Sequence, residues 1–514
     1  MLSRIGRDEL LPVSTIPASN SGDRSPRTRS PRTRSPARSG ALVKRGSGRA
    51  KSAYKRLIVA CDGTWLNSDH GMQNGELSVP SNITRISRAI KAESDDGIPQ
   101  VVYYHFGVGS QGGMLDRVVM GAVGEGLREN VREAYSFLSN NYSEGDEIFL
   151  LGFSRGAFTV RAVAGIIATV GLLTKKGLAY WPEIFRDVMH RRDSHYTPKN
   201  TDIPFRNKPS AGNPRYRDEL YRRGLSDVNV TIKAIGVWDT VGALGLPRIN
   251  VLTRVGLQTD QSREMSFYDT KLSSCVENAF QALALDERRT AFGPAVWEKP
   301  ANNRTKLRQV WFPGVHSNVG GGYDDQEIAN ISLAWMMSQL SPFLDMYSNY
   351  IIQQEDENVE YYRSRHKKVR PWSFGKICNS MSGIYAIGGG TTRTPGTYYA
   401  VNPGDGRVTD RPLRDTHEYI HPSVRARILN RGPGMDDKGD YEPEAMDEWK
   451  LVIEYPYGLD ARPEVYWKAR FSDKNVSTRI LPESPLGVVE RKLLGLDEDM
   501  EQEIMWPKPT KRGN

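Results

Sequence analysis

The stretch Gly152-Phe153-Ser154-Arg155-Gly156 decides how the rest of the chain is read. An apolar run, Glu147 to Leu151, precedes it, and a long run of small and apolar residues, Ala157 to Leu173, follows it. This order predicts a buried strand, a sharp turn and a helix, which is the setting in which the serine of a G-x-S-x-G motif acts as a nucleophile. The glycines let the backbone turn tightly and be approached closely. We therefore expect Ser154 at the carboxyl end of a central strand.

Strand and helix patterns alternate on both sides of this turn. Short apolar runs predict strands at residues 56–61, 101–106, 148–153, 230–238 and 307–312. Helical spacing predicts helices that start at Ser81 or Asn82 and that cover residues 115–142, 156–173, 277–289 and 331–340. Apolar strands that alternate with helices are typical of a parallel sheet covered on both faces. The expected fold class is α/β, with an α/β-hydrolase-like, mostly parallel sheet.

Composition divides the 514 residues into three parts. Residues 1–53 are rich in Ser, Pro, Arg and Gly and contain a near-repeat from Arg24 to Pro36, so we expect a disordered arm without a core. Residues 54–345 hold the alternating pattern and form the predicted catalytic domain. The pattern weakens in residues 346–514, which we expect to complete or decorate that domain.

The net charge of +9 belongs to the arm. Residues 1–55 hold 13 Lys and Arg against 3 Asp and Glu, which leaves 57 against 58 for the rest of the chain. Nucleic-acid binding by the folded body is therefore not expected. A solvated tail, a nuclear address, a phosphorylated arm and a tether to RNA or anionic lipid all stay open for the basic segment.

The sequence shows no sign of a disulfide framework, a metal site or a membrane span. Cys61, Cys275 and Cys378 lie far apart without C-x-x-C spacing. The first 13 residues lack an apolar core, and the longest apolar run, Ala162 to Leu173, is too short for a span. We expect a cytoplasmic protein without a signal peptide, transmembrane segment, metal or other cofactor. The basic arm keeps a nuclear location open, and peripheral membrane contact is compatible with the sequence.

A serine becomes a good nucleophile when a base takes its proton and a carboxylate holds that base in one tautomer. Asp239 and His316 each follow a predicted strand, so both are expected at the carboxyl edge of the sheet, near Ser154. The chain order Ser, Asp, His is that of the α/β-hydrolases. Asp286 is the alternative acid, and His421 is the alternative base.

An acyl-transfer site also needs amide donors for the negative charge that develops on the substrate oxygen. The amide of Arg155, at the start of the helix, is one candidate. The amide of Gly63 or Thr64, in the loop after the first strand, is the other, with Asp62 orienting that loop. Asp62-Gly63-Thr64 is also similar to the D-x-D-G-T loop of aspartyl-phosphate phosphatases, but Ala60 stands at the position of their nucleophile.

Five ordered motifs resemble one family. They are Cys61 to Trp65, Gly152 to Ala157, Val237 to Val241, Ala282 to Arg288 and Trp311 to Tyr323. The family is the α/β-hydrolase family typified by the catalytic domain of type VI secretion phospholipase effectors, which has many fungal members. The resemblance covers roughly residues 55–345. It implies a serine esterase or lipase acting on small-molecule, lipid or phospholipid esters, with Ser154 as nucleophile, Asp239 as acid and His316 as base.

Three positions depart from the family pattern. Asn318 stands where an aspartate is usual, Gln281 where a histidine is common, and Asn330 where an aspartate often precedes the apolar helix. The histidine also comes one strand earlier than in the usual α/β-hydrolase order, which keeps His421 as an alternative to His316. The competing hypothesis is a non-catalytic protein of this fold that uses its basic arm to bind a partner or nucleic acid.

Overall fold

The structure is a computed structural model. It describes residues 52–63, 72–73, 76–77, 79–107, 122–193, 195–241, 271–381, 390–402, 408–456, 462–471, 476 and 478–509. The predicted arm up to residue 51 and the predicted oxyanion donor Thr64 lie outside these residues.

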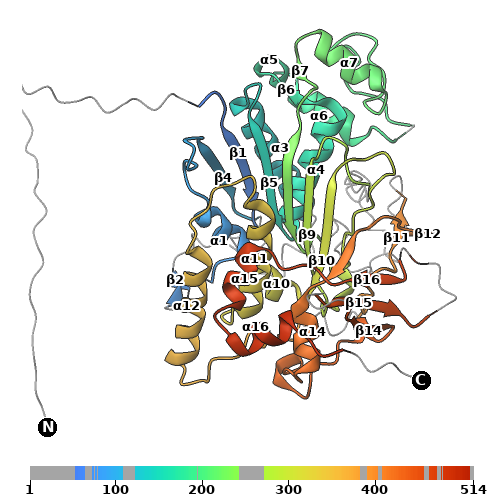
Figure 1. Cartoon of the computed structure of the whole chain (residues 1–514). Coiled ribbons are helices and arrows are strands. Elements are labelled where there is room, and N and C mark those ends of the chain that lie inside the picture. The colour runs from blue at the N-terminus through green and yellow to red at the C-terminus, as the bar shows by residue number, and fades with distance from the viewer. Residues whose placement is uncertain are drawn as a thin grey trace, which may run out of the picture. The chain divides into compact units, whose positions relative to one another are not determined.

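A seven-stranded sheet, parallel throughout, forms the centre of the described residues (Figure 1). Its strands, in spatial order, are β13 (Glu418–Ile420), β10 (Lys306–Phe312), β9 (Asn278–Ala284), β8 (Ile232–Trp238), β5 (Glu147–Phe153), β1 (Arg56–Cys61) and β4 (Gln100–His105). The strand that precedes Ser154, β5, lies in the middle, with Cys61 of β1 beside Gly152 and Trp238 of β8 beside Phe153. The predicted α/β class with a mostly parallel sheet is confirmed.

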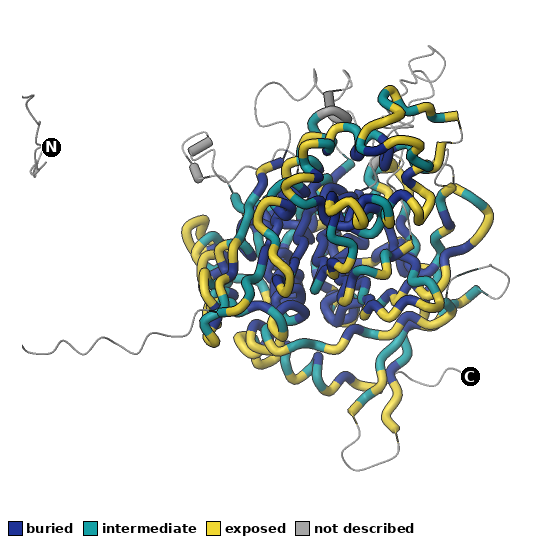
Figure 2. Tube along the Cα trace, turned by 90° about the horizontal axis from the view of Figure 1, so that it is seen from above, coloured by how far each residue is buried: buried dark blue, intermediate teal, exposed yellow. Residues whose placement is uncertain are grey.

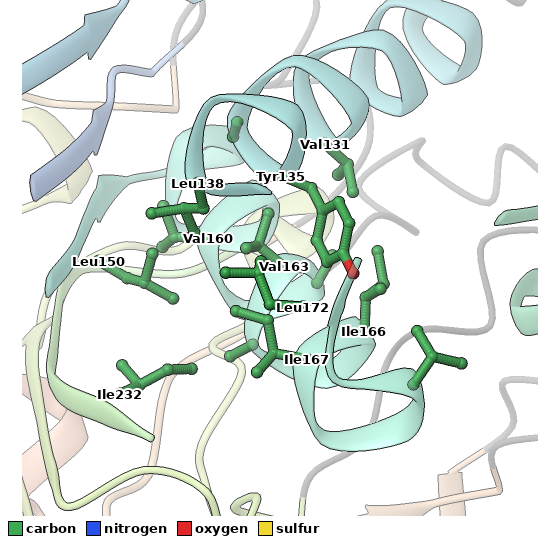
Figure 3. Packing of buried hydrophobic residues seen from close by; sticks show 14 of the residues in the cluster. Val131, Tyr135, Leu138, Leu150, Val160, Val163, Ile166, Ile167, Leu172 and Ile232 are labelled. Atoms are coloured by element: carbon green, nitrogen blue, oxygen red, sulfur yellow. The ribbon is translucent and has the colours of Figure 1, made fainter. Parts of the chain in front are cut away.

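Helices cover both faces of this sheet, because successive strand side chains point to opposite sides. In β5, Ile148 and Leu150 join the layer under one group of helices: α3 (Ala122–Asn141), α4 (Arg155–Val170) and α6 (Trp181–Met189). Phe149 and Leu151 join the layer under another: α1 (Asn82–Ala89), α11 (Glu327–Leu340), α15 (Val488–Leu494) and α16 (Glu498–Met505). Both layers are buried, as the dark blue centre of Figure 2 shows, and Figure 3 shows Leu150 among side chains of α3 and α4 in the first layer.

Shorter elements surround these layers. Those before residue 345 are β2 (Met72–Gln73), β3 (Glu76–Leu77), β6 (Leu172–Leu173), α5 (Lys175–Leu178), α7 (Pro214–Arg222), β7 (Ser226–Asp227), a 3-10 turn (Thr290–Phe292) and α10 (His316–Gly320). Those after it are α12 (Tyr350–Ser364), β11 (Tyr399–Val401), β12 (Val408–Pro412), α14 (Pro422–Leu429), two 3-10 turns (Met435–Asp437 and Glu444–Met446), β14 (Trp449–Glu454), β15 (Glu464–Ala469) and β16 (Ile480–Pro482). In the described part of the chain, no helix is long and apolar enough to span a membrane.

The helix predicted at residues 277–289 is wrong, since this segment forms β9. All seven residues of β9 are buried, and a strand buried on both faces loses the alternation that distinguishes it from an apolar helix. β9 lies between β8 and β10, so His316 follows one strand later than the sequence pattern indicated. The strand order therefore no longer gives a reason to prefer His421.

The segment after residue 345 is packed into the same core. β13 pairs in parallel with β10 and extends the central sheet at its edge. β14, β15 and β16 form a separate antiparallel sheet, whose Trp449 and Trp467 pack with Trp311 of β10. The helices that the structure describes in this segment, α12, α14, α15 and α16, were not predicted. The domain limits at residues 54, 345 and 346 remain predictions.

Candidate active site

The turn after β5 holds Ser154 in an unusual backbone conformation, with φ 56° and ψ −118°. Residues other than glycine rarely adopt a positive φ, and such strain is concentrated at functional sites. The flanking glycines are required by close packing. A Cβ on Gly156 would lie 2.0 Å from the carbonyl oxygen of Cys61, and one on Gly152 would lie 2.6 Å from Cα of Ala157. α4 begins at the next residue, so the positive end of its dipole lies at the serine.

Asp239 and His316 meet at the carboxyl edge of the sheet, where β8 and β10 end. Oδ2 of Asp239 lies 2.6 Å from Nδ1 of His316, and Oδ1 accepts from the amide of Ala284 at 3.0 Å. The amide of Ser154 donates to the carbonyl of Trp238, directly before Asp239, at 3.1 Å. These contacts bring the strands that carry the three predicted residues together.

The ring of His316 packs against the elbow itself. Its centroid lies 4.6 Å from that of Phe153, the residue before Ser154, and 5.0 Å from that of Phe292. His316 is 5% exposed and Ser154 7% exposed. Among the residues that the structure describes, Nε2 of His316 has no hydrogen-bond partner.

A buried arginine that the sequence did not single out, Arg393, also binds Asp239. Its Nη1 and Nη2 lie 2.6 Å and 3.1 Å from the two carboxylate oxygens. Burial would raise the pKa of the Asp239 carboxyl, but Arg393 and then His316 hold it well below its ordinary value. In turn, Asp239 raises the pKa of Arg393 despite burial of the guanidinium. No sequence signal marks Arg393, which follows a glycine run 154 residues after Asp239.

Asp286, the alternative acid, binds the loop before His316 and not the imidazole ring. Its Oδ2 accepts from the amide of Gly314 at 2.6 Å and from the hydroxyl of Tyr441 at 2.8 Å. Burial raises the pKa of Asp286 to about 6. Gly314 precedes His316 by two residues and has φ +100°. Asp286 therefore holds the loop that carries the histidine and makes no hydrogen bond to the imidazole among the described contacts.

The carboxylate of Glu287, next in the chain, also supports this loop. It accepts from the amide of His316 at 3.3 Å and from the hydroxyl of Ser380 at 2.9 Å. Its ion pair with Arg289 lies at 2.8 Å. Burial opposes the charge of Glu287, but Arg289 lowers its pKa below the ordinary value. Asp286 and Glu287 thus fix the backbone on which His316 stands.

His421, the alternative base, is fully buried with both ring nitrogens engaged. Nδ1 lies 2.7 Å from Oγ of Ser423, and Nε2 lies 3.0 Å from Oε1 of Glu490. The ring stacks on Phe312 with centroids 4.4 Å apart. His421 caps α14 and connects it to α15, which is a structural position.

The loop after β1 lies beside the serine, since a Cβ on Gly63 would lie 3.2 Å from Cβ of Ser154. The Gly63 amide donates to Oδ1 of Asp62 at 2.7 Å. Oδ2 of Asp62 accepts from three hydroxyls, those of Ser81 (2.6 Å), Tyr104 (2.9 Å) and Thr84 (3.2 Å). Burial raises the pKa of Asp62 to about 6 although these hydrogen bonds oppose the shift. Asp62 thus anchors the loop, and in this arrangement it holds the Gly63 amide.

Gln281, Asn318 and Asn330, the three positions that depart from the family pattern, are buried. The side-chain amide of each has at least two hydrogen-bond partners. Their hydrogen bonds join Gln281 to Thr240 and Gln309, Asn318 to Val315 and Lys376, and Asn330 to Arg85 and Glu355. Nδ2 of Asn318 donates to the carbonyl of Lys376 at 2.8 Å, which a carboxylate could not do. The amide at this position therefore suits the contact with the segment after residue 345.

The described residues contain no cluster of three or more His, Cys, Asp or Glu side chains placed to hold a metal ion. What the site does contain is a strained serine at a helix start, an imidazole with one nitrogen on a carboxylate, and a guanidinium behind that carboxylate. A hydroxyl, an imidazole and a carboxylate are the groups that a proton transfer from a serine to a histidine uses.

The fold and the site define an α/β protein with a strained serine at a strand-to-helix turn of its central sheet. A family match covers residues 55–339 and is described as the type VI secretion system phospholipase effector Tle1-like catalytic domain. Since the match covers more than half of the chain, the chain belongs to this family. The resemblance based on five sequence motifs is thereby confirmed.

Individual relatives share low sequence identity with this chain. The uncharacterised protein YEL023C of Saccharomyces cerevisiae is 26% identical over 254 residues, which are 47% of this chain and 32% of the relative, so the chain spans about a third of its length. Two solved structures are also similar. One is the Tle1 effector bound to the VgrG spike from the type 6 secretion system (TM-score 0.29, 18% identity, 54% of this chain and 52% of that chain). The other is an uncharacterised protein from Pseudomonas aeruginosa (TM-score 0.32, 17% identity, 62% and 52%).

Proposed function

We propose that this chain is a serine hydrolase that cleaves carboxylic ester bonds of lipids, with phospholipids as the leading substrate class. The observation that carries the proposal is the 2.6 Å contact between Nδ1 of His316 and the buried carboxylate of Asp239, beside a serine with positive φ. A carboxylate in this position favours the tautomer in which Nδ1 carries the proton and Nε2 is free to accept one.

In the proposed reaction, Oγ of Ser154 attacks the acyl carbonyl while Nε2 of His316 takes the hydroxyl proton. Asp239 keeps the imidazole oriented and stabilises the imidazolium. When the tetrahedral intermediate collapses, the ester bond breaks and His316 gives its proton to the leaving alcohol. Water, activated by the same imidazole, then hydrolyses the acyl-enzyme and releases the fatty acid.

The oxyanion would be held first by the amide of Arg155, because this residue opens α4 directly after the nucleophile. The second donor is assigned to the loop of Gly63 and Thr64. Because the Gly63 amide donates to Asp62 in the structure, its use by a substrate requires that hydrogen bond to be exchanged for one to the oxyanion.

The lipid class rests on the family, whose description names phospholipase effectors. The residues of the site favour acyl transfer in general and do not select an acyl chain. A phospholipid substrate implies contact with a membrane surface during turnover. The cytoplasmic location proposed from the sequence would place that surface on the inner side of a cellular membrane.

The test compares fatty acid release from phosphatidylcholine and phosphatidylglycerol vesicles, and from a soluble p-nitrophenyl ester, by wild type, Ser154→Ala and Ser364→Ala. Ser364 is exposed at the end of α12 and is the matched control. We expect hydrolysis to fall at least about 10³-fold in Ser154→Ala and to stay unchanged in Ser364→Ala. Wild-type rates in Ser154→Ala would contradict the proposed nucleophile, and release from the soluble ester alone would contradict the lipid class.

A further inference from the structure

Arg393 is the residue through which the C-terminal segment reaches the acid–base pair. It lies outside residues 55–339, the part matched by the family, and its side chain is 3% exposed against 0% for Asp239. Besides the two contacts to Asp239, its Nη1 donates to the carbonyl of Ala284 at 2.6 Å and its Nη2 to the carbonyl of Phe292 at 2.5 Å. These four contacts fix the plane of the guanidinium.

This geometry is more specific than that of a generic ion pair. The arginine binds both oxygens of the carboxylate whose Oδ2 also faces His316. Burial of a guanidinium costs free energy unless its charge is paired. An arginine that binds both oxygens of a carboxylate in a bidentate pair fixes the orientation of the carboxylate and also favours its ionised form. The carbonyl of Phe292 also connects Arg393 to a ring that packs on His316. The carboxylate of Asp239 thus has contacts with both Arg393 and His316.

We propose that Arg393 is a positioning residue for the hydrolytic site, acting through Asp239 to orient the carboxylate and to oppose protonation of the Asp239–His316 pair. Its effect on turnover rests on the proposed function, whereas its effect on the pair does not. The segment after residue 345 then contributes to the site, since it supplies the guanidinium that binds Asp239.

The sign of the effect follows from charge. Asp239 and His316 lie 2.6 Å apart, and the form of the pair proposed to act as a base has an ionised carboxylate and a neutral imidazole. The other charged or titratable groups around the pair are Glu287 with its partner Arg289, Asp286, and Tyr398. Removing the cation of Arg393 makes proton uptake by the pair easier, so the base form is lost at higher pH.

The experiment measures the rate at which a fluorophosphonate labels folded protein from pH 5 to pH 9, for wild type, Arg393→Met, Arg393→Lys and Arg427→Met. Arg427 is the control, because it is a buried arginine that donates only to the carbonyls of Ser373, Gly375 and Pro433 among the described contacts. We expect the acid limb to move up by about 1–3 pH units in Arg393→Met. Arg427→Met should lose stability without moving the limb.

Arg393→Lys and one further variant, Arg393→Gly, distinguish a positioning effect from a folding effect. Arg393→Lys keeps the positive charge but loses the two guanidinium donors that bind both oxygens of Asp239. The acid limb of its pH–rate profile should therefore stay near that of wild type, while the maximal labelling rate falls. In Arg393→Gly, added methylguanidinium should restore the labelling rate at pH 6. An unmoved acid limb in folded Arg393→Met, or an equal shift in Arg427→Met, would overturn the inference.

A readout without catalysis distinguishes this inference from the proposed function. The ring resonances of His316, assigned with His316→Gln, are titrated by NMR in wild type and Arg393→Met. A midpoint that moves to higher pH in the variant supports the inference even if the wild type hydrolyses no ester. An unchanged midpoint rejects it even if the wild type is an active esterase.

Discussion

His316 and His421 lie beyond the ends of adjacent parallel strands, β10 and β13, and differ in what their rings contact. Both are buried, and each has a carboxylate within 3.0 Å of one ring nitrogen. In His421 the second nitrogen is also bound, by the hydroxyl of Ser423. In His316, within the described residues, the second nitrogen has no partner. Burial beside a carboxylate is therefore common to both histidines, and the proposal that His316 is the base rests on the difference at the second ring nitrogen.

Exchanging each histidine for glutamine breaks this comparison most directly. His316→Gln should slow fluorophosphonate labelling at least about 10³-fold, because the substitution removes the proposed base. His421→Gln should lower the unfolding free energy by about 1–3 kcal/mol, because buried partners lose their hydrogen bonds, and should leave labelling of the folded protein near wild type. Labelling rates and urea denaturation curves are measured side by side. The reverse pattern would make His421 the base.

The two acidic candidates give the next largest contrast. Asp239→Asn should slow labelling about 10³–10⁴-fold, because an amide can favour the wrong tautomer of His316 and leaves Arg393 without its anion. Asp286→Asn should have a far smaller effect, since an amide oxygen can still accept from Gly314. Labelling of both variants at one pH tests this order. Equal losses would mean that the loop contact of Asp286 matters as much as the direct contact of Asp239.

Buried carboxylates in two regions should respond to pH with opposite signs. Burial raises the pKa of Glu327, at the start of α11, from its ordinary 4.5 to about 8, so the native state holds a proton that the unfolded chain has lost. Stability should therefore fall as pH rises from about 5 to 8, by at most about 1.4 kcal/mol per pH unit for this group. Asp239, whose pKa is depressed, contributes stability above its ordinary value of 3.8 that is lost as pH falls below it.

Urea denaturation at pH 5, 6.5 and 8 measures the Glu327 contribution. Glu327→Gln removes the titrating group and should flatten the decline of the unfolding free energy between pH 5 and pH 8. An equal slope in wild type and variant would show that Glu327 is ionised in the native protein throughout this range.

The smallest effect is expected from the arm. Removal of residues 1–53 should leave hydrolysis of a soluble ester unchanged, because Ser154, Asp239 and His316 all lie in the part of the chain that the family match covers. Loss of activity on the soluble ester would contradict this expectation and would place the arm in the catalytic machinery.

The sequence predicted the elements that carry strong local signals. The glycines around Ser154, the apolar run of β5 and the helical spacing of α1 identify the elbow and the parallel sheet, because each is set by nearby residues. β9 was misread because a strand buried on both faces has no alternation. Asp239 and His316 could be selected by their places after strands, and their contact is what the structure adds.

Other parts of the site depend on contacts across long separations. Arg393 gave no signal, since its place is set by the packing of the segment after residue 345 and by the charge of Asp239. The hydrogen bond between Gly63 and Asp62 is local, but its relevance depends on Ser154 lying beside it in the fold. Sequence patterns report neighbours along the chain and along one element, whereas these contacts join different elements.

The most direct test of the account is to react folded wild-type protein with a fluorophosphonate and to map the adduct by mass spectrometry. The account predicts one phosphonylated residue, Ser154, with labelling abolished in Ser154→Ala and strongly slowed in His316→Gln. No adduct on folded wild type, or an adduct on another serine that persists in Ser154→Ala, would contradict the claim that the elbow serine is activated by the Asp239–His316 pair.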